Sequence, residues 1–209
     1  CAVALHQAGV AVQMFEASDG VGGRVRSDHV DGFTLDRGFQ VALTAYPEMH
    51  RQLDMAALDL RAFEPGALVW RNGRGAVVGD PFRRPSTTLS TVTAPIGSVF
   101  DKARIGLLRH RVRSVHPVRL LQGADGSTRD ALTDAGFSDK IIERFFRPLV
   151  GGIQLDPELA DSRRVFDIIF RMLADGDSAV PAAGMQAIPD QLAAKLPPVP
   201  SRCICAFFS

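Results

Sequence analysis

A short apolar run that ends in an acidic residue constrains the fold of this chain most strongly. Residues 1–9 have the pattern of a helix end, and Gly9 stands where a helix C-terminal glycine belongs. Residues 10–15 form the apolar run, which predicts a strand, and Glu16 follows it directly. Helix, glycine, strand and terminal acid make the second half of a βαβ unit, so the sequence predicts an α/β fold.

The composition is ordinary for a globular protein and narrows the classes of function. Of 209 residues, 46% are hydrophobic and 22% are charged, which argues against disorder. The net charge of +1 gives no strong field toward nucleic acid, so we expect no nucleic-acid partner. No run of 18 apolar residues is present, so we expect no transmembrane helix.

The cysteines and histidines indicate a reducing compartment and no metal centre. The only cysteines, Cys1, Cys203 and Cys205, stand at the ends of the chain and cannot form a disulfide framework. We therefore expect a cytoplasmic location. The five histidines lack any ligand spacing, so no metal site is predicted.

Along the rest of the chain, the pattern of hydrophobic and polar residues changes twice. Residues 33–41 predict a strand with a tight turn at Gly38, and 46–58 predict a helix with Pro47 in its first turn. From 61 the pattern turns to β, with a hairpin whose turn is residues 72–75. From about 100 to 175 the pattern is helical, and Gly176 ends the last of these helices; a short helix is expected within 181–196.

Glu16 is the first residue that suggests chemistry. An acid at the end of the second strand of a dinucleotide-binding unit accepts hydrogen bonds from the ribose hydroxyls of adenosine. An ionised carboxylate suits this role because it only accepts hydrogen bonds. Taken alone, Glu16 is better explained as a solvated strand end.

The segment after Glu16 favours the ribose-binding role over the solvated strand end. Residues 16–25, Glu-Ala-Ser-Asp-Gly-Val-Gly-Gly-Arg-Val, resemble the segment after the ribose-binding acid in the flavin amine oxidase superfamily. Residues 31–41 resemble the strand and glycine turn that pass beside the flavin there. The resemblance implies FAD as cofactor. The FAD-binding residues that it implies are Glu16, Ala17, Ser18, Gly22, Gly23, Arg24, Gly38, Phe39 and Gln40.

The resemblance extends to residue 196 and implies an order of domains. Residues 1–60 correspond to part of a Rossmann-type FAD-binding domain, and 61–180 to an inserted α+β, mainly helical, substrate domain. Residues 181–209 correspond to the return into the FAD-binding domain, and their last stretch, 201–209, is an atypical tail.

The glycine fingerprint that precedes such an acid would fall before Cys1, and the segment that closes over the flavin would follow residue 209. We therefore expect a chain cut at both ends of its cofactor-binding domain. A truncated, non-catalytic chain that cannot hold FAD remains an alternative.

The resemblance implies an oxidoreductase that oxidises a C–N or C–C bond by hydride transfer to flavin. The expected substrate is a small apolar amine, a polyene or a porphyrinogen-like molecule. An apolar pocket lined by residues such as Phe145, Phe146 or Phe170 would suit all three. No catalytic acid or base is predicted.

A basic stretch between residues 104 and 119 leaves one further alternative. The solvated face of a helix is the explanation we favour, and peripheral membrane contact, as in a membrane-associated desaturase or porphyrinogen oxidase-like protein, is the other. The basic side chains are Arg104, Arg109, His110, Arg111, Arg113, His116 and Arg119.

Overall fold

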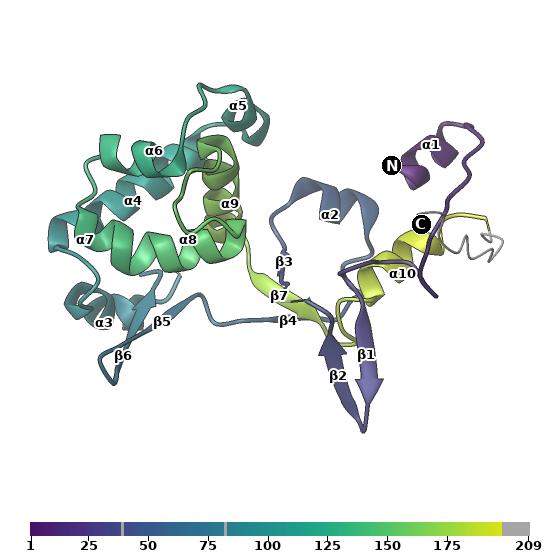
Figure 1. The fold of residues 1–209 in the computed structure, drawn as a ribbon, viewed down its shortest axis with the longest axis horizontal. Helices are drawn as coiled ribbons and strands as arrows, with labels where there is room; N and C mark the ends of the chain where they lie inside the picture. The colour runs from purple at the N-terminus through teal and green to yellow at the C-terminus, as the bar shows by residue number, and fades with distance from the viewer. Residues whose placement is uncertain (39, 82, 198–209) are drawn as a thin grey trace, which may run out of the picture. The chain divides into compact units, whose positions relative to one another are not determined.

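The computed structural model describes residues 1–38, 40–81 and 83–197 (Figure 1). The chain forms two compact units. Unit 1 contains residues 1–63 and the chain from Asp177 onward, and unit 2 contains residues 64–176. The predicted assignment of 1–60 and 181–209 to cofactor binding, and of 61–180 to substrate binding, stays a prediction.

Unit 1 is built from short helices and two small antiparallel sheets. One sheet is the hairpin β1–β2, and the other has the order β3-β7-β4 with β7 in the centre. Because β7 comes from the far end of unit 1, it joins two distant parts of the chain, with Ala42 opposite Ala179 and Arg61 opposite Val180. The elements are α1 (Ala2–Gln7), β1 (Ser27–Val30), β2 (Phe33–Asp36), β3 (Ala42–Leu43), α2 (Pro47–Gln52), β4 (Leu60–Ala62), β7 (Ser178–Pro181) and α10 (Ala187–Ala193).

The turn of the β1–β2 hairpin follows from its sequence. Asp31 has φ +50° and Gly32 has φ +82°, so both central residues are left-handed. A two-residue turn of this kind matches the twist of the flanking strands, and Asp-Gly is one of the pairs that favour it. The hairpin pairs Ser27 with Asp36 and Val30 with Phe33.

The predicted strand at residues 10–15 is wrong for the described structure. This stretch has no assigned strand, and none of the described strands pairs with it. A strand forms only where a neighbouring backbone satisfies its N–H and C=O groups, which an apolar sequence cannot supply for itself. The helix before it is confirmed, and Gly9 has the left-handed φ of +75° expected of a helix C-terminal glycine.

Three other element boundaries in unit 1 differ from prediction. The strand expected at 33–41 is the shorter β2, and the helix expected at 46–58 is α2, with Pro47 in its first turn as predicted. Within 181–196 the helix α10 occupies only the later part, and β7, which precedes it, was not predicted. A long-range hydrogen bond next to β3 and β7, from the Thr44 N–H to the Asp177 carbonyl oxygen, joins the two parts of unit 1.

Unit 2 combines one hairpin with a bundle of helices, drawn teal to green in Figure 1. The hairpin is confirmed, and its turn residues Asn72 (φ +50°) and Gly73 (φ +73°) are again both left-handed. The elements are β5 (Gly66–Arg71), β6 (Arg74–Gly79), η1 (Pro85–Thr87), α3 (Thr88–Thr93), α4 (Val99–Ser114), α5 (Pro117–Gln122), α6 (Thr128–Asp134), α7 (Asp139–Ile141), the π-helical turn η2 (Ile142–Phe146), α8 (Arg147–Gln154) and α9 (Arg163–Asp175).

One hydrophobic cluster holds unit 2 together, and Phe146 lies at its centre with no exposed surface. Phe146 meets Phe137, Phe145 and Phe166 edge-on, with ring centroids 4.9, 5.4 and 6.1 Å away. Aromatic pairs favour this geometry because the positive ring edge meets the negative ring face.

The π-helical turn before α8 has a cause in the sequence. Pro148 lacks an N–H group, and its ring would clash with the carbonyl of Arg144, four residues earlier, in a regular helix. The wider turn over Ile142–Phe146 relieves this conflict without ending the helical path. As a result Ile142 and Phe146 both reach the core.

The fold is therefore mixed α and β, as predicted. All the pairings between its described strands are antiparallel, so the parallel Rossmann sheet stays a prediction. Among the described residues, no helix has the length and apolar character needed to cross a membrane.

Candidate cofactor-binding site

The predicted ribose-binding acid is held by the residue two positions after it. The Ser18 backbone N–H donates to Glu16 Oε1 over 2.8 Å, and Ser18 Oγ lies 2.8 Å from the same oxygen. The Ser18 backbone and side-chain hydrogen bonds lower the pKa of the Glu16 carboxyl. Glu16 is exposed and stays an ionised acceptor at neutral pH, which is the state that ribose hydroxyls require.

Two adjacent glycines of the following loop adopt backbone conformations that favour glycine. Gly22 has φ +112° and Gly23 has φ +52°. A Cβ on Gly22 would lie 2.9 Å from Pro189 Cγ, so the loop is packed tightly on that side. A Cβ on Gly23 would meet nothing within 4 Å, so the backbone of Gly23 stands beside open space.

The second predicted segment lies against the first. A Cβ on Gly38 would stand 3.3 Å from the Arg24 carbonyl oxygen and 3.7 Å from Gln40 Nε2. The structure thus brings Arg24, Gly38 and Gln40 together, although the prediction placed them in two separate motifs. Arg24 is exposed. Ala17 lies between Glu16 and Ser18 and is exposed, and Phe39 lies outside the described residues.

Arg26 is a residue of this loop that the sequence reasoning missed. Its Nη1 atom forms an ion pair with Asp19 Oδ1 over 2.6 Å and lies 3.5 Å from Ser18 Oγ. Only 12% of the Arg26 side chain is exposed, against 82% for Asp19. The sequence does show a second arginine two positions after Gly-Gly-Arg, which could have marked it as a candidate. Its partner Asp19 could not be identified from spacing alone.

The segment from Gly184 to Asp190 also contacts the loop, and it was predicted only as a return of the chain. Gln186 Nε2 donates to the Val21 carbonyl over 3.1 Å, and the Gln186 backbone N–H donates to Ser27 Oγ over 3.1 Å. The Met185 N–H donates to Asp36 Oδ1 over 3.0 Å. The end of unit 1 therefore holds the glycine loop and the hairpin in one arrangement.

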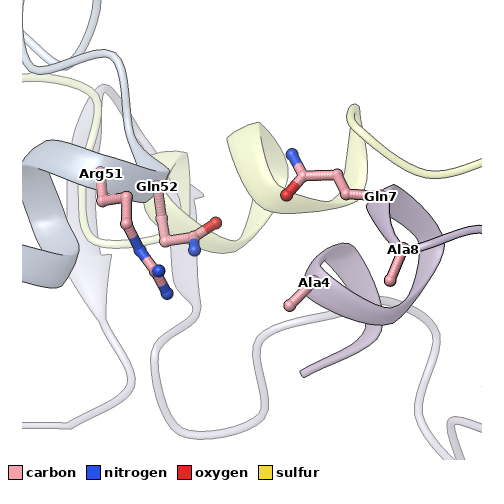
Figure 2. A pocket seen from close by; sticks show the side chains of 5 residues that line it. All are labelled: Ala4, Gln7, Ala8, Arg51 and Gln52. Carbon is pink, nitrogen blue, oxygen red and sulfur yellow. The ribbon is translucent and has the colours of Figure 1, made fainter.

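A separate hollow in unit 1, of about 380 Å³, is open to solvent. Figure 2 shows its lining, with Ala4 and Gln7 from α1, Ala8 directly after that helix, and Arg51 and Gln52 from α2. None of the described residues predicted to bind FAD lines it. Its described lining offers one charged side chain, Arg51, and no acidic group, so it does not match the ribose-binding chemistry.

In unit 2 the predicted apolar pocket needs a correction. Phe146 is fully buried against Phe137 and Phe166, so it cannot line an accessible pocket. Phe170 does line a small, wholly apolar pocket between α8 and α9. Its lining residues are Leu149, Val150, Ile153, Phe166, Ile169, Phe170 and Leu173.

Several arginines of the basic stretch form contacts within unit 2. Arg111 pairs with Asp167 over 2.5 Å, and Arg113 pairs with Asp175 over 2.5 Å. Arg109 donates to the Ala174 carbonyl over 3.2 Å. These contacts join α4 to α9, so part of the basic stretch stabilises the bundle. Peripheral membrane contact stays a prediction.

The loop offers three kinds of group that suit an adenine dinucleotide. Glu16 supplies an ionised acceptor, Gly23 an approachable backbone, and Arg24 an exposed cation for phosphate oxygens. These groups fit the adenosine diphosphate part of FAD. In the described part of the chain, no cluster of three or more His, Cys, Asp or Glu side chains could hold a metal ion.

Comparison with known proteins agrees with this chemistry. The family model for flavin-containing amine oxidoreductase matches residues 1–202. The chain is also similar to coproporphyrinogen III oxidases of Mycobacterium bovis and Mycobacterium tuberculosis, each 26% identical over 151 residues. Each match covers 68% of this chain and 31% of the relative, so the chain spans about a third of these relatives. The chain belongs to the flavin-containing amine oxidoreductase family, a family of FAD-dependent oxidoreductases.

Proposed function

We propose that this chain contributes the adenosine-binding part of the FAD site of an oxidoreductase. The observation that carries the proposal is the Glu16 carboxylate, which Ser18 holds ionised and which the left-handed glycine pair Gly22 and Gly23 follows in the same loop. The family match supports it independently, because the family is flavin-containing.

Each group of the loop has a role in this proposal. Glu16 accepts hydrogen bonds from the adenosine ribose hydroxyls, and Arg24 meets the diphosphate oxygens. Gly23, which stands beside open space, lets the backbone approach the cofactor without a side chain in the way. Gly22, whose missing side chain makes room for Pro189, is proposed as a further contact through its backbone. The backbone of Gly38 lies close to the Arg24 carbonyl oxygen and to the Gln40 side chain. Gly38, Gln40, Ala17 and Phe39 are proposed as further contacts.

When bound, FAD supplies the two-electron acceptor for oxidation of a C–N or C–C bond. The protein's part is to bind and orient the cofactor and substrate and to exclude water. Among an amine, a polyene and a porphyrinogen, we favour a porphyrinogen-like substrate because the similar proteins carry the name coproporphyrinogen III oxidase.

Binding of FAD and FMN to the purified chain tests the adenosine role. FMN lacks the adenosine ribose, so we expect FAD to bind more tightly, and ADP to compete with it. Glu16→Gln should weaken FAD binding roughly tenfold or more, because hydrogen bonds to a charged group contribute about 1.5–3 kcal/mol. The same change should leave FMN binding as it was.

Glu48→Gln is the matched control, since Glu48 is an exposed carboxylate of unit 1 that pairs with Arg51 on α2. It should bind FAD like the unchanged chain. Equal affinity of the unchanged chain for FAD and FMN would overturn the adenosine role. Equal loss in the Glu16 and Glu48 variants would point to net charge in place of a specific contact.

The substrate class is tested separately by anaerobic reduction of the flavin-loaded chain. A porphyrinogen should bleach the flavin absorbance faster than a primary amine or a polyene at equal concentration. Faster bleaching by the amine would contradict the substrate proposal and leave the cofactor proposal standing.

A further inference from the structure

We propose that Arg26 is a positioning residue that holds the loop from Glu16 to Gly23 in its binding shape without touching the ligand. The inference rests on the proposed function for the identity of the ligand, FAD. The role of Arg26 in holding the loop stands on contacts within unit 1.

Arg26 follows the loop in the sequence, and its side chain reaches back to residues near the start of the loop. Its Nη1 atom bonds Asp19 Oδ1 over 2.6 Å and lies 3.5 Å from Ser18 Oγ. Ser18 is the residue that orients the Glu16 carboxylate. One side chain therefore links the far end of the loop to the residue that fixes the ribose-binding acid.

The same side chain fills the inside of the loop. A Cβ on Gly20 would lie 3.6 Å from Arg26 Nη2, and a Cβ on Gly22 would lie 3.1 Å from Arg26 Cγ. Gly20 is thus close to the guanidinium group of Arg26, and Gly22 is close to its aliphatic stem. A shorter side chain at this position would leave a space beneath Gly20 and Gly22.

Burial separates Arg26 from Arg24. The Arg26 side chain is 12% exposed, and its Nε atom is buried without a hydrogen-bond partner among the described residues. Arg24 is exposed, next to the open space beside Gly23. Arg24 is therefore the arginine that a phosphate can reach, whereas Arg26 acts through the shape of the loop.

The pair with Asp19 is asymmetric in a way that supports this role. Asp19 is 82% exposed and Arg26 is largely enclosed, so the arginine is the fixed partner. The hydrogen bond from Arg26 lowers the pKa of the Asp19 carboxyl, and the pair stays charged at neutral pH. The guanidinium offers several donors in a rigid plane, which a lysine ammonium cannot match.

Amide hydrogen exchange and FAD titration on the full chain, measured on the same variants, test the proposal. Arg26→Gln should speed exchange of the amides from Ala17 to Gly23 about tenfold and weaken FAD binding by a similar factor. Arg26→Lys should restore part of both, because it keeps the charge and most of the stem. Arg24→Gln should weaken FAD binding and leave loop exchange unchanged.

Arg61→Gln is the matched control, because Arg61 forms an exposed pair with Asp59 in unit 1 outside the loop. It should change neither readout. Unchanged loop exchange in Arg26→Gln would overturn the inference whether or not FAD binds. Faster loop exchange with unaltered FAD affinity would overturn the positioning role. If the unchanged chain binds no FAD, the proposed function fails, while loop exchange still decides whether Arg26 holds the loop.

Should Arg26→Gln alone fail to fold, exchange throughout unit 1 would rise, and the Lys variant then decides. Restored loop protection and FAD binding in Arg26→Lys support the proposal. The proposal is contradicted if Arg26→Lys folds and binds FAD as tightly as the unchanged chain, while its loop amides exchange as fast as those of an unfolded segment.

Discussion

Unit 2 and unit 1 are stabilised by different means. Among its described residues, unit 2 buries thirteen apolar residues in one continuous cluster around Phe146. The buried hydrophobic residues among those described in unit 1 are Val3, Ala42, Leu58, Ala179 and Met185, and Pro181 and Gly184 are buried as well. Its predicted ligand loop is instead held by hydrogen bonds and the ion pair of Arg26 with Asp19.

This difference indicates that unit 2 is stable on its own and that unit 1 depends more on its ligand. Apolar burial is the main favourable term in folding, so unit 2 has the means to be stable without a ligand. Regions with few buried apolar contacts open more easily, and ligand-binding loops belong to such regions. A ligand that binds only the folded form stabilises it, so FAD should stabilise unit 1 in particular.

The largest expected effect comes from removing the centre of the unit 2 core. Phe146→Ala should lower the free energy of unfolding of unit 2 by about 3–5 kcal/mol, because it leaves a cavity among Phe137, Phe145 and Phe166. Urea denaturation followed by hydrogen exchange of each unit measures the loss. Phe100→Ala is the control, since Phe100 is 76% exposed and should cost little. Similar losses in both variants would contradict the claim that the buried cluster around Phe146 stabilises unit 2.

Asp101 gives the next largest effect, and it tests the polar part of unit 2. This buried carboxylate accepts hydrogen bonds from the backbone and hydroxyl groups of Ser98 and Ser138, which join the start of α4 to the start of α7. Asp101→Asn should cost about 2 kcal/mol, because the neutral amide keeps only part of this network.

The pH dependence of stability checks the same residue. Burial alone would raise the pKa of Asp101, but the hydrogen bonds from Ser138 and Ser98 lower it to about 2. Because the folded pKa lies below the unfolded value of 3.8, the stabilisation is complete above about pH 4. It is lost as pH falls through 2. The Asn variant should show a flatter decline of stability over this range, and parallel declines would contradict the assignment.

A smaller effect distinguishes the two glycines of the loop in unit 1. Gly22→Ala should cost about 2 kcal/mol, because its φ of +112° is strained for alanine and the new Cβ would meet Pro189. Gly23→Ala should cost about 1 kcal/mol, since φ +52° is a left-handed conformation that alanine tolerates better and the site is open. Thermal unfolding of the two variants ranks them, and a larger loss at Gly23 would contradict the packing of the loop.

The smallest expected effect concerns a buried acid of unit 2. Burial raises the pKa of Asp167, and Arg111 and Arg163 oppose this shift. A raised folded pKa means that the acid contributes most below the unfolded value of 3.8 and less as pH rises through the folded pKa. Asp167→Asn should therefore change stability at pH 7 by no more than about 1 kcal/mol, because both arginines can return to water. A loss above about 2 kcal/mol by urea denaturation would show that the ion pairs dominate.

The features that the sequence predicted correctly are mostly local. The hairpin turn at Asn72 and Gly73, the helix glycine Gly9 and the helical pattern from 100 to 175 depend on nearby residues. In each case the residues that cause the structure lie within a few positions of it. The full burial of Phe146 was not predicted, because the cluster around it includes residues as distant in the sequence as Val78 and Phe166.

The features that the sequence missed depend on distant partners. The stretch 10–15 has strand composition but no pairing strand among those described, and β7 forms because it pairs with both β3 and β4. In the candidate site, spacing gave Glu16 and the glycines. The link from Gln186 to Val21 spans 165 positions and only the fold reveals it.

Hydrogen exchange of the whole chain with and without FAD tests the central claim most directly. The account predicts slower exchange on adding FAD in residues 16–24 and in the segment 184–190 that contacts this loop, with little change through the Phe146 core. Protection confined to unit 2, or protection absent from residues 16–24 at saturating FAD, would contradict the placement of the cofactor site in unit 1.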